Sequence, residues 1–70
     1  MIIQKAQFST GGFALHKVGT LSGNGKASAW FDANGGLINA ELFDSIGRAY
    51  SIKEHSPLWN HLQRIGKIWA

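Results

Sequence analysis

The chain has 70 residues, of which 44% are hydrophobic and only 16% are charged. This is the composition of a folded protein of one domain, expected over residues 1–70, and the absence of cysteine excludes disulfides and thiolate metal sites. The formal net charge of +3 arises from only 4 acidic residues against 7 basic ones, so it is weak support for nucleic-acid binding.

Glycine divides the first two thirds of the chain into short segments that favour β-structure. Asn24-Gly25 and Asn34-Gly35 each lie between two such segments, and Asn-Gly is typical of a tight hairpin turn in which both residues adopt positive φ. Regularly spaced short strands with turns between them predict an α+β fold built on a five-stranded antiparallel meander, which can also curl into a small half-open barrel. The expected strands are Ile2–Ser9, Phe13–Thr20, Ala27–Asp32, Leu37–Phe43 and Arg48–Lys53.

The register of the hairpin around Asn34-Gly35 predicts two different sheet faces. If Asp32 pairs with Leu37, Phe31 pairs with Ile38, and three small residues and a leucine complete an apolar face. These four residues are Ala27, Ala29, Ala40 and Leu42. The other face then carries Trp30 beside Asn39, and Ser28 beside Glu41, so a large aromatic side chain stands on the side that the core does not need.

A helix is expected from Ser56 to Ile65, packed on the face with the small residues. Ser56 is a favourable N-cap, and Pro57 suits the first helical turn because its missing N–H is not needed there. One stripe of the helix is apolar and the opposite face is polar. The stripe consists of Leu58, Leu62, Ile65 and Trp69, and the polar face of Asn60, Gln63, Arg64 and Lys67. Gly66 is interpreted as a stop that ends the helix.

Motifs for catalysis and ligand binding are incomplete. Asp32-Ala33-Asn34-Gly35 resembles the start of a calcium loop, but a hairpin turn explains it and the required glutamate is missing, because Phe43 takes its position. Ser22–Lys26 lacks the hydroxyl residue and the following helix of a phosphate-binding loop. The histidines at positions 16, 55 and 61 do not follow a zinc-site spacing, and no nucleophile elbow is present. We therefore expect no enzyme, no cofactor and no metal.

The setting expected for the chain is cytoplasmic and without a membrane partner. The first residues lack the apolar core of a signal peptide, and no apolar run approaches the roughly 20 residues needed to cross a bilayer.

The favoured function is that of a small non-catalytic interaction or regulatory protein, self-associating through an aromatic sheet face. One core of this size provides little net stability, so burial against a homo-oligomer or a protein partner is the expected supplement. Three tryptophans among few charges are typical of an interface core. The alternative is a single-stranded nucleic-acid-binding module that uses sheet aromatics and scattered lysines and arginines. The residues expected at the interaction surface are Trp30, Tyr50, Arg48, Lys53 and Trp59.

Overall fold

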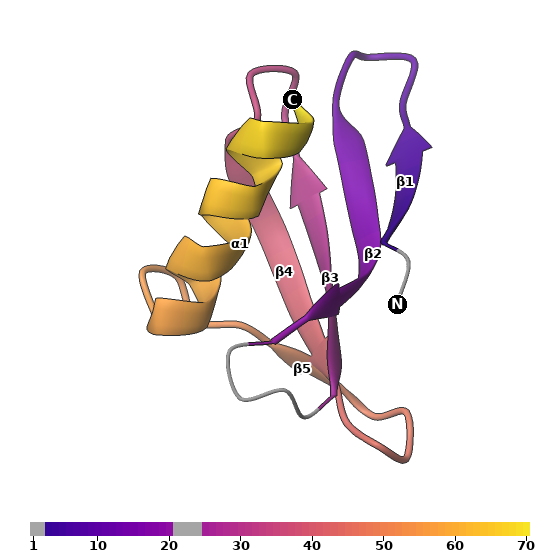
Figure 1. Cartoon of the computed structure of the whole chain (residues 1–70), viewed down its shortest axis with the longest axis vertical. Helices are drawn as coiled ribbons and strands as arrows, with labels where there is room; N and C mark the ends of the chain where they lie inside the picture. Colours follow the sequence, from indigo (N-terminus) through magenta and orange to yellow (C-terminus); the bar gives the residue numbers. More distant parts are fainter. Residues whose placement is uncertain (1–2, 21–24) are drawn as a thin grey trace.

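A computed structural model describes residues 3–20 and 25–70, in which five antiparallel strands in chain order form one sheet followed by a single helix (Figure 1). The predicted meander with a C-terminal helix is confirmed, and the sheet stays open, with β1 and β5 at its two edges. Ile2, and Ser22, Gly23 and Asn24 of the predicted turn and glycine-rich loop, lie outside the described residues. The elements are β1 (Gln4–Gln7), β2 (Phe13–Gly19), β3 (Lys26–Phe31), β4 (Leu37–Phe43), β5 (Ala49–Ser51) and α1 (Pro57–Trp69).

The β3–β4 hairpin closes with a three-residue loop instead of the expected two-residue turn. The Asp32 N–H donates to the Gly36 carbonyl and the Gly35 N–H donates to the Asp32 carbonyl. Of the Asn-Gly pair only Gly35 has positive φ, at 82°. This is a turn followed by one left-handed residue and a bulge. This loop places Asp32 opposite Gly36 and Phe31 opposite Leu37, so the predicted pairings of Asp32 with Leu37 and of Phe31 with Ile38 are wrong. A shift of register at Ile38, which has no partner on β3, then restores the predicted pairing from Trp30 and Asn39 onward.

The rest of the predicted β3–β4 register is confirmed, and with it the seat of the helix. Ala27 pairs with Leu42 and Ala29 with Ala40. Ala27, Ala29 and Ala40 are buried in one cluster with Leu62 of α1. Small residues in the sheet thus leave room for larger side chains from the helix, which fill the core. The other three residues of the predicted helical stripe, Leu58, Ile65 and Trp69, pack against the same cluster.

The helix begins as predicted but continues past Gly66. The Ser56 hydroxyl accepts a hydrogen bond from the Trp59 N–H at 3.2 Å, and Pro57 occupies the first turn. The prediction that Gly66 ends the helix is wrong, because α1 runs to Trp69. Gly66 is buried, and a Cβ on it would lie 2.1 Å from Cε1 of Phe31. Glycine is therefore required here for close contact with an aromatic ring of the sheet, not for termination.

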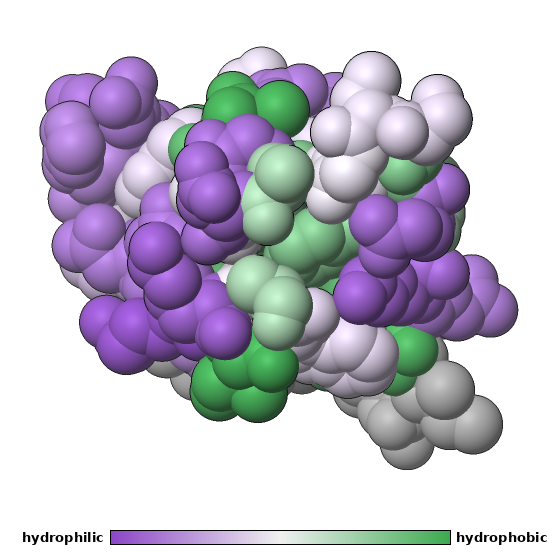
Figure 2. Space-filling model, turned by 90° about the horizontal axis from the view of Figure 1, so that it is seen from above, coloured by the Kyte–Doolittle hydropathy of each residue, from purple (hydrophilic) through white to green (hydrophobic). Residues whose placement is uncertain are grey.

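The C-terminal half of α1 is fastened to the β3–β4 loop by Gln63, which was expected on the solvent face. Its side-chain amide donates to the Gly35 carbonyl at 2.7 Å, and its oxygen accepts from the Leu37 N–H at 2.8 Å. Figure 1 shows the end of the helix beside this loop, and Figure 2, a view onto this end, shows a band of hydrophobic and near-neutral residues between hydrophilic flanks. Helix and sheet thus form one packed unit at this end.

Candidate interaction surface

The face of the sheet opposite α1 carries no second layer of secondary structure within the described residues, and we call it the open face. Side chains alternate along a strand, and directly paired residues point to the same side. Since Ala27, Ala29 and Phe31 face the helix, their neighbours Lys26, Ser28 and Trp30 face away from it. By the same alternation and register the open face consists of Gln4, Ala6, Ala14, His16, Lys26, Ser28, Trp30, Asn39, Glu41, Phe43, Ala49 and Ser51.

Trp30 forms a small cluster with His16 at the centre of the open face. The two rings meet edge to face, with centroids 5.9 Å apart and an interplanar angle of 83°. Nδ1 of His16 lies 2.9 Å from the hydroxyl oxygen of Ser28, a hydrogen bond in either tautomer. Ala14, the cross-strand partner of Trp30, is only 1% exposed although no helix covers it. We infer that the half-buried Trp30 side chain covers the sheet locally and presents the rest of its ring to solvent.

A row of polar side chains crosses the sheet next to Trp30. Gln4 pairs with His16, Ser28 pairs with Glu41, and Glu41 pairs with Ser51. The hydrogen bond between His16 and Ser28 joins the two halves of this row across β2 and β3. Each of the five strands therefore contributes one polar side chain to the row, beside an aromatic centre.

The pair of His16 and Ser28 resembles part of a nucleophilic dyad, but its setting differs from one. Ser28 lies in the middle of a central strand and is only 6% exposed. A serine nucleophile needs an accessible hydroxyl next to backbone donors for an oxyanion. The geometry fits a structural role, in which the hydrogen bond satisfies two polar side chains on the face of the sheet that α1 does not cover.

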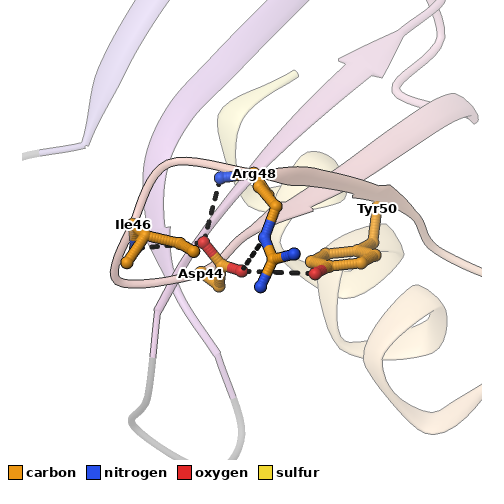
Figure 3. A network of polar contacts seen from close by, with 4 residues as sticks. All are labelled: Asp44, Ile46, Arg48 and Tyr50. Atoms are coloured by element: carbon orange, nitrogen blue, oxygen red, sulfur yellow. Dashed lines mark hydrogen bonds and ion pairs between the residues drawn. The ribbon is translucent and has the colours of Figure 1, made fainter.

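The β4–β5 loop contains the second polar network, centred on Asp44 (Figure 3). One carboxylate oxygen accepts from the N–H groups of Ile46 and Arg48, at 3.0 and 2.9 Å. The other oxygen lies 3.4 Å from Nε of Arg48 and accepts from the Tyr50 hydroxyl at 3.3 Å. This network holds the Tyr50 ring and the Arg48 guanidinium side by side at an exposed turn.

These contacts shift the ionisation of both partners. The pKa of Asp44 is lowered from its ordinary value, chiefly by the hydrogen bond from the Arg48 N–H. Partial desolvation opposes this effect, and the Ile46 N–H, the Tyr50 hydroxyl and the Arg48 side chain reinforce it. The pKa of Tyr50 is raised, first by partial desolvation and then by the charge of Asp44 and the hydrogen bond to it. The network is thus most stable with Asp44 ionised and Tyr50 protonated.

The structure brings only two of the five predicted surface residues together. Arg48 and Tyr50 meet at Asp44, whereas Trp30 lies on the other face of the sheet, since Tyr50 pairs with Leu42 of the helix side. Lys53 is exposed beyond β5, where its carbonyl accepts from the Ser56 N–H. Trp59 is half-buried and packs against the core from α1.

The sequence-based prediction did not include His16, Ser28 or Glu41 in the site. Alternation in β3 and β4 already placed Ser28 and Glu41 beside Trp30. His16 was harder to place, because a shift of register between Leu15 and Val18 separates it from the regular pairing.

The turns after β3 and β4 share a sequence motif. Phe31-Asp32-Ala33-Asn34-Gly35 recurs as Phe43-Asp44-Ser45-Ile46-Gly47. In both turns one aspartate oxygen accepts from the N–H groups two and four residues later. The glycine of each motif has positive φ, 82° and 86° respectively.

Comparison with protein-family models, with curated proteins and with solved structures found no match. Among residues 3–20 and 25–70, no three or more His, Asp or Glu side chains are grouped in a way that could hold a metal ion. In the same part of the chain, no helix has the length and apolar character required to cross a membrane.

Proposed function

We propose that this protein is a small non-catalytic interaction domain that self-associates through the open face of its sheet. The observation that supports the proposal is the position of Trp30. It is half-buried on the face that α1 does not cover, and its neighbours are the polar but uncharged Ser28 and Asn39. A partly exposed tryptophan with few charges around it is the usual composition of an interface centre.

A second copy of the chain is the occupant that this face suits best. The open face carries groups of both signs, Glu41 on β4 and Lys26 on β3. In a two-fold arrangement the same patch meets itself, so an acidic group of one copy can oppose a basic group of the other. A chain of 70 residues without cysteine also gains from burying further surface.

The test is the molar mass in solution of variants on the open face, measured by light scattering. Asn39 is exposed and pairs with Trp30, so Asn39→Arg introduces a charge beside Trp30 without removing a core side chain. We expect this variant, and separately Trp30→Gln, to have a lower average mass than the wild type. The matched control is Ile68→Arg, at an 80% exposed position on the helix, which should leave the mass unchanged. Wild-type mass in both open-face variants would contradict the proposal.

Binding of single-stranded nucleic acid is the second candidate, and the Asp44 network supports it. The Tyr50 ring is 48% exposed and lies beside the Arg48 guanidinium, so a base could stack on the ring while the cation meets a phosphate. Titration with a single-stranded oligonucleotide at low salt should then quench tryptophan or tyrosine fluorescence and weaken steeply as salt is raised. Tyr50→Ala should abolish the binding, whereas Ile68→Ala should not. No spectral change at low salt would remove this candidate.

A further inference from the structure

Strand β1 forms one edge of the sheet and presents a row of backbone hydrogen-bonding groups. The Phe8 N–H donates to the carbonyl of Gly12, the residue before β2, so the pair of Phe8 and Gly12 is a hydrogen-bonded pair. Hydrogen-bonded and non-hydrogen-bonded pairs alternate along an antiparallel ladder. Ala6, paired with Ala14, therefore bonds to β2, whereas the N–H and C=O groups of Lys5 and Gln7 point away from it. Among the described strands none lies beyond β1 (Figure 1).

The usual protection of an exposed edge strand is weak in β1. Edge strands are commonly guarded by a lysine, a proline or a bulge. Pairing of β1 with β2 is regular, without a bulge, and the strand Gln4–Gln7 contains no proline. Its one lysine, Lys5, is turned back onto its own molecule. Nζ donates to the Trp69 carbonyl at 3.1 Å, at the end of α1, and lies 4.8 Å from the centroid of the Phe13 ring.

We propose that β1 pairs antiparallel with β1 of a second copy of this chain, around a two-fold axis at Ala6. In this register Lys5 faces Gln7 of the other copy in both directions, so the outward N–H and C=O groups of all four residues are bonded. Ala6 then lies opposite Ala6 of the second copy. The two form a non-hydrogen-bonded pair, where the backbones approach most closely and a small side chain fits.

The neighbouring registers are less favourable. If Lys5 opposed Lys5 of the second copy, two like charges would face each other across the strands. If Gln7 opposed Gln7, then Lys5 would face Ser9, which lies in the β1–β2 turn outside the strand. Of these three registers, only the one centred on Ala6 hydrogen-bonds the outward backbone groups of both Lys5 and Gln7 within the strand and places no like charges opposite each other.

The pairing joins the two sheets of five strands edge to edge into one continuous sheet. A two-fold axis perpendicular to the sheet keeps both helices on one side and both open faces on the other. The two Trp30 side chains then lie on the same surface. This contact goes beyond the proposed function, because it uses the backbone of β1 and leaves the open face uncovered.

Disulfide trapping tests the pairing, because the chain has no cysteine of its own. Cross-strand residues at a non-hydrogen-bonded pair are close enough for a disulfide. Under mild oxidation of the full chain, Ala6→Cys should give a covalent dimer in high yield. Ala49→Cys is the matched control, since Ala49 is also an alanine on the open face of an edge strand, β5. Ala6→Cys that stays monomeric, or Ala49→Cys that cross-links equally fast, would overturn the proposal.

Two further variants separate this contact from association through the open face. The Ala6→Cys protein should still cross-link when Asn39→Arg is added. Asn39 lies on β4, which two strands separate from β1 in the sheet. Gln7→Pro removes an outward N–H and leaves the backbone bonds between β1 and β2 in place, but it also removes the side-chain bonds of Gln7 to the Gly11 and Gly12 carbonyls. Gln7→Ala, which removes only those side-chain bonds, is its control, and Gln7→Pro should lower the solution mass below that of Gln7→Ala at unchanged circular dichroism. Loss of cross-linking in the Asn39→Arg background, or wild-type mass in Gln7→Pro, would contradict edge pairing. These variants can thus support edge pairing while they contradict association through the open face, or contradict edge pairing while they support the open-face contact.

Discussion

Gly66 of α1 lies against the ring of Phe31 in β3 so closely that a Cβ at position 66 would come within 2.1 Å of Cε1 and 2.5 Å of Cδ1. Phe31 is 1% exposed and stacks on Phe13 of β2, with ring centroids 4.9 Å apart. The backbone of α1 can therefore come this close to the Phe31 ring only because residue 66 has no side chain. This contact fixes the position of α1 over the sheet.

Gly66→Ala should therefore destabilise the fold. In an exposed helix interior this change stabilises by about 1 kcal/mol. Here overpacking against a buried ring should reverse the sign, with a loss of about 1–3 kcal/mol. Urea unfolding followed by circular dichroism measures the change. Gly19→Ala is the control, because a Cβ at Gly19 meets nothing within 4 Å. A more stable Gly66→Ala protein would show that the ring moves aside.

Gln63→Ala should loosen the joint between α1 and the β3–β4 loop. It removes the bonds to Gly35 and Leu37, and it leaves the partners with fewer hydrogen bonds in a partly buried place. The expected loss in unfolding free energy is about 1–3 kcal/mol. The exposed Lys67→Ala, on the same helix, should change it by less than about 0.5 kcal/mol. Equal effects of the two substitutions would contradict a role for Gln63 in fastening the helix.

Asp44 should contribute to the acid sensitivity of the fold. Its pKa is lowered in the folded protein, so folding favours the ionised carboxylate. The stabilisation is complete above the unfolded pKa of about 3.9 and is lost as the pH falls through the lower folded value. Asp44→Asn should flatten the fall in unfolding free energy below about pH 4 relative to the wild type. If the unfolding free energy of Asp44→Asn fell with decreasing pH as steeply as that of the wild type, this role would be contradicted.

Tyr50 should act at the opposite end of the pH scale. Its pKa is raised, so folding favours the protonated phenol. That stabilisation is present below the unfolded pKa of about 10 and is lost as the pH rises through the folded value. Tyr50→Phe should remove this alkaline dependence while it keeps the ring. Urea unfolding at several pH values above about pH 9 measures the unfolding free energy of both proteins. If this free energy fell with pH as steeply in Tyr50→Phe as in the wild type, the phenol would not stabilise the fold in this way.

Much of the fold could be predicted because its determinants are local. The glycine breaks, the apolar alternation of β3 and β4, and the capping of α1 by Ser56 and Pro57 each depend on a few neighbouring residues. Two of the errors of detail show why, because each needed information from outside its own segment. Gly66 is explained only by the ring of Phe31, and the pairing of Phe31 with Leu37 only by the three-residue loop that Gly35 closes.

The candidate surface could be predicted less well, because it depends on registers that local patterns do not determine. The outward position of Trp30 followed from the β3–β4 register. His16 reaches Ser28 only through the irregular pairing of β2 with β3, where Lys17 adopts a φ of 62°. A lysine in the sequence does not predict a positive φ, because residues other than glycine, asparagine and aspartate rarely adopt one. The separation of Tyr50 from Trp30 likewise required the pairing of β5 with β4.

Self-association is the central claim, and sedimentation equilibrium of the wild-type chain over a wide range of protein concentrations tests it most directly. The mass of one chain is 7.6 kDa. We expect an average mass that rises above this value with concentration, towards the mass of a discrete oligomer. A mass of one chain at every concentration would contradict both the open-face contact and the pairing of β1.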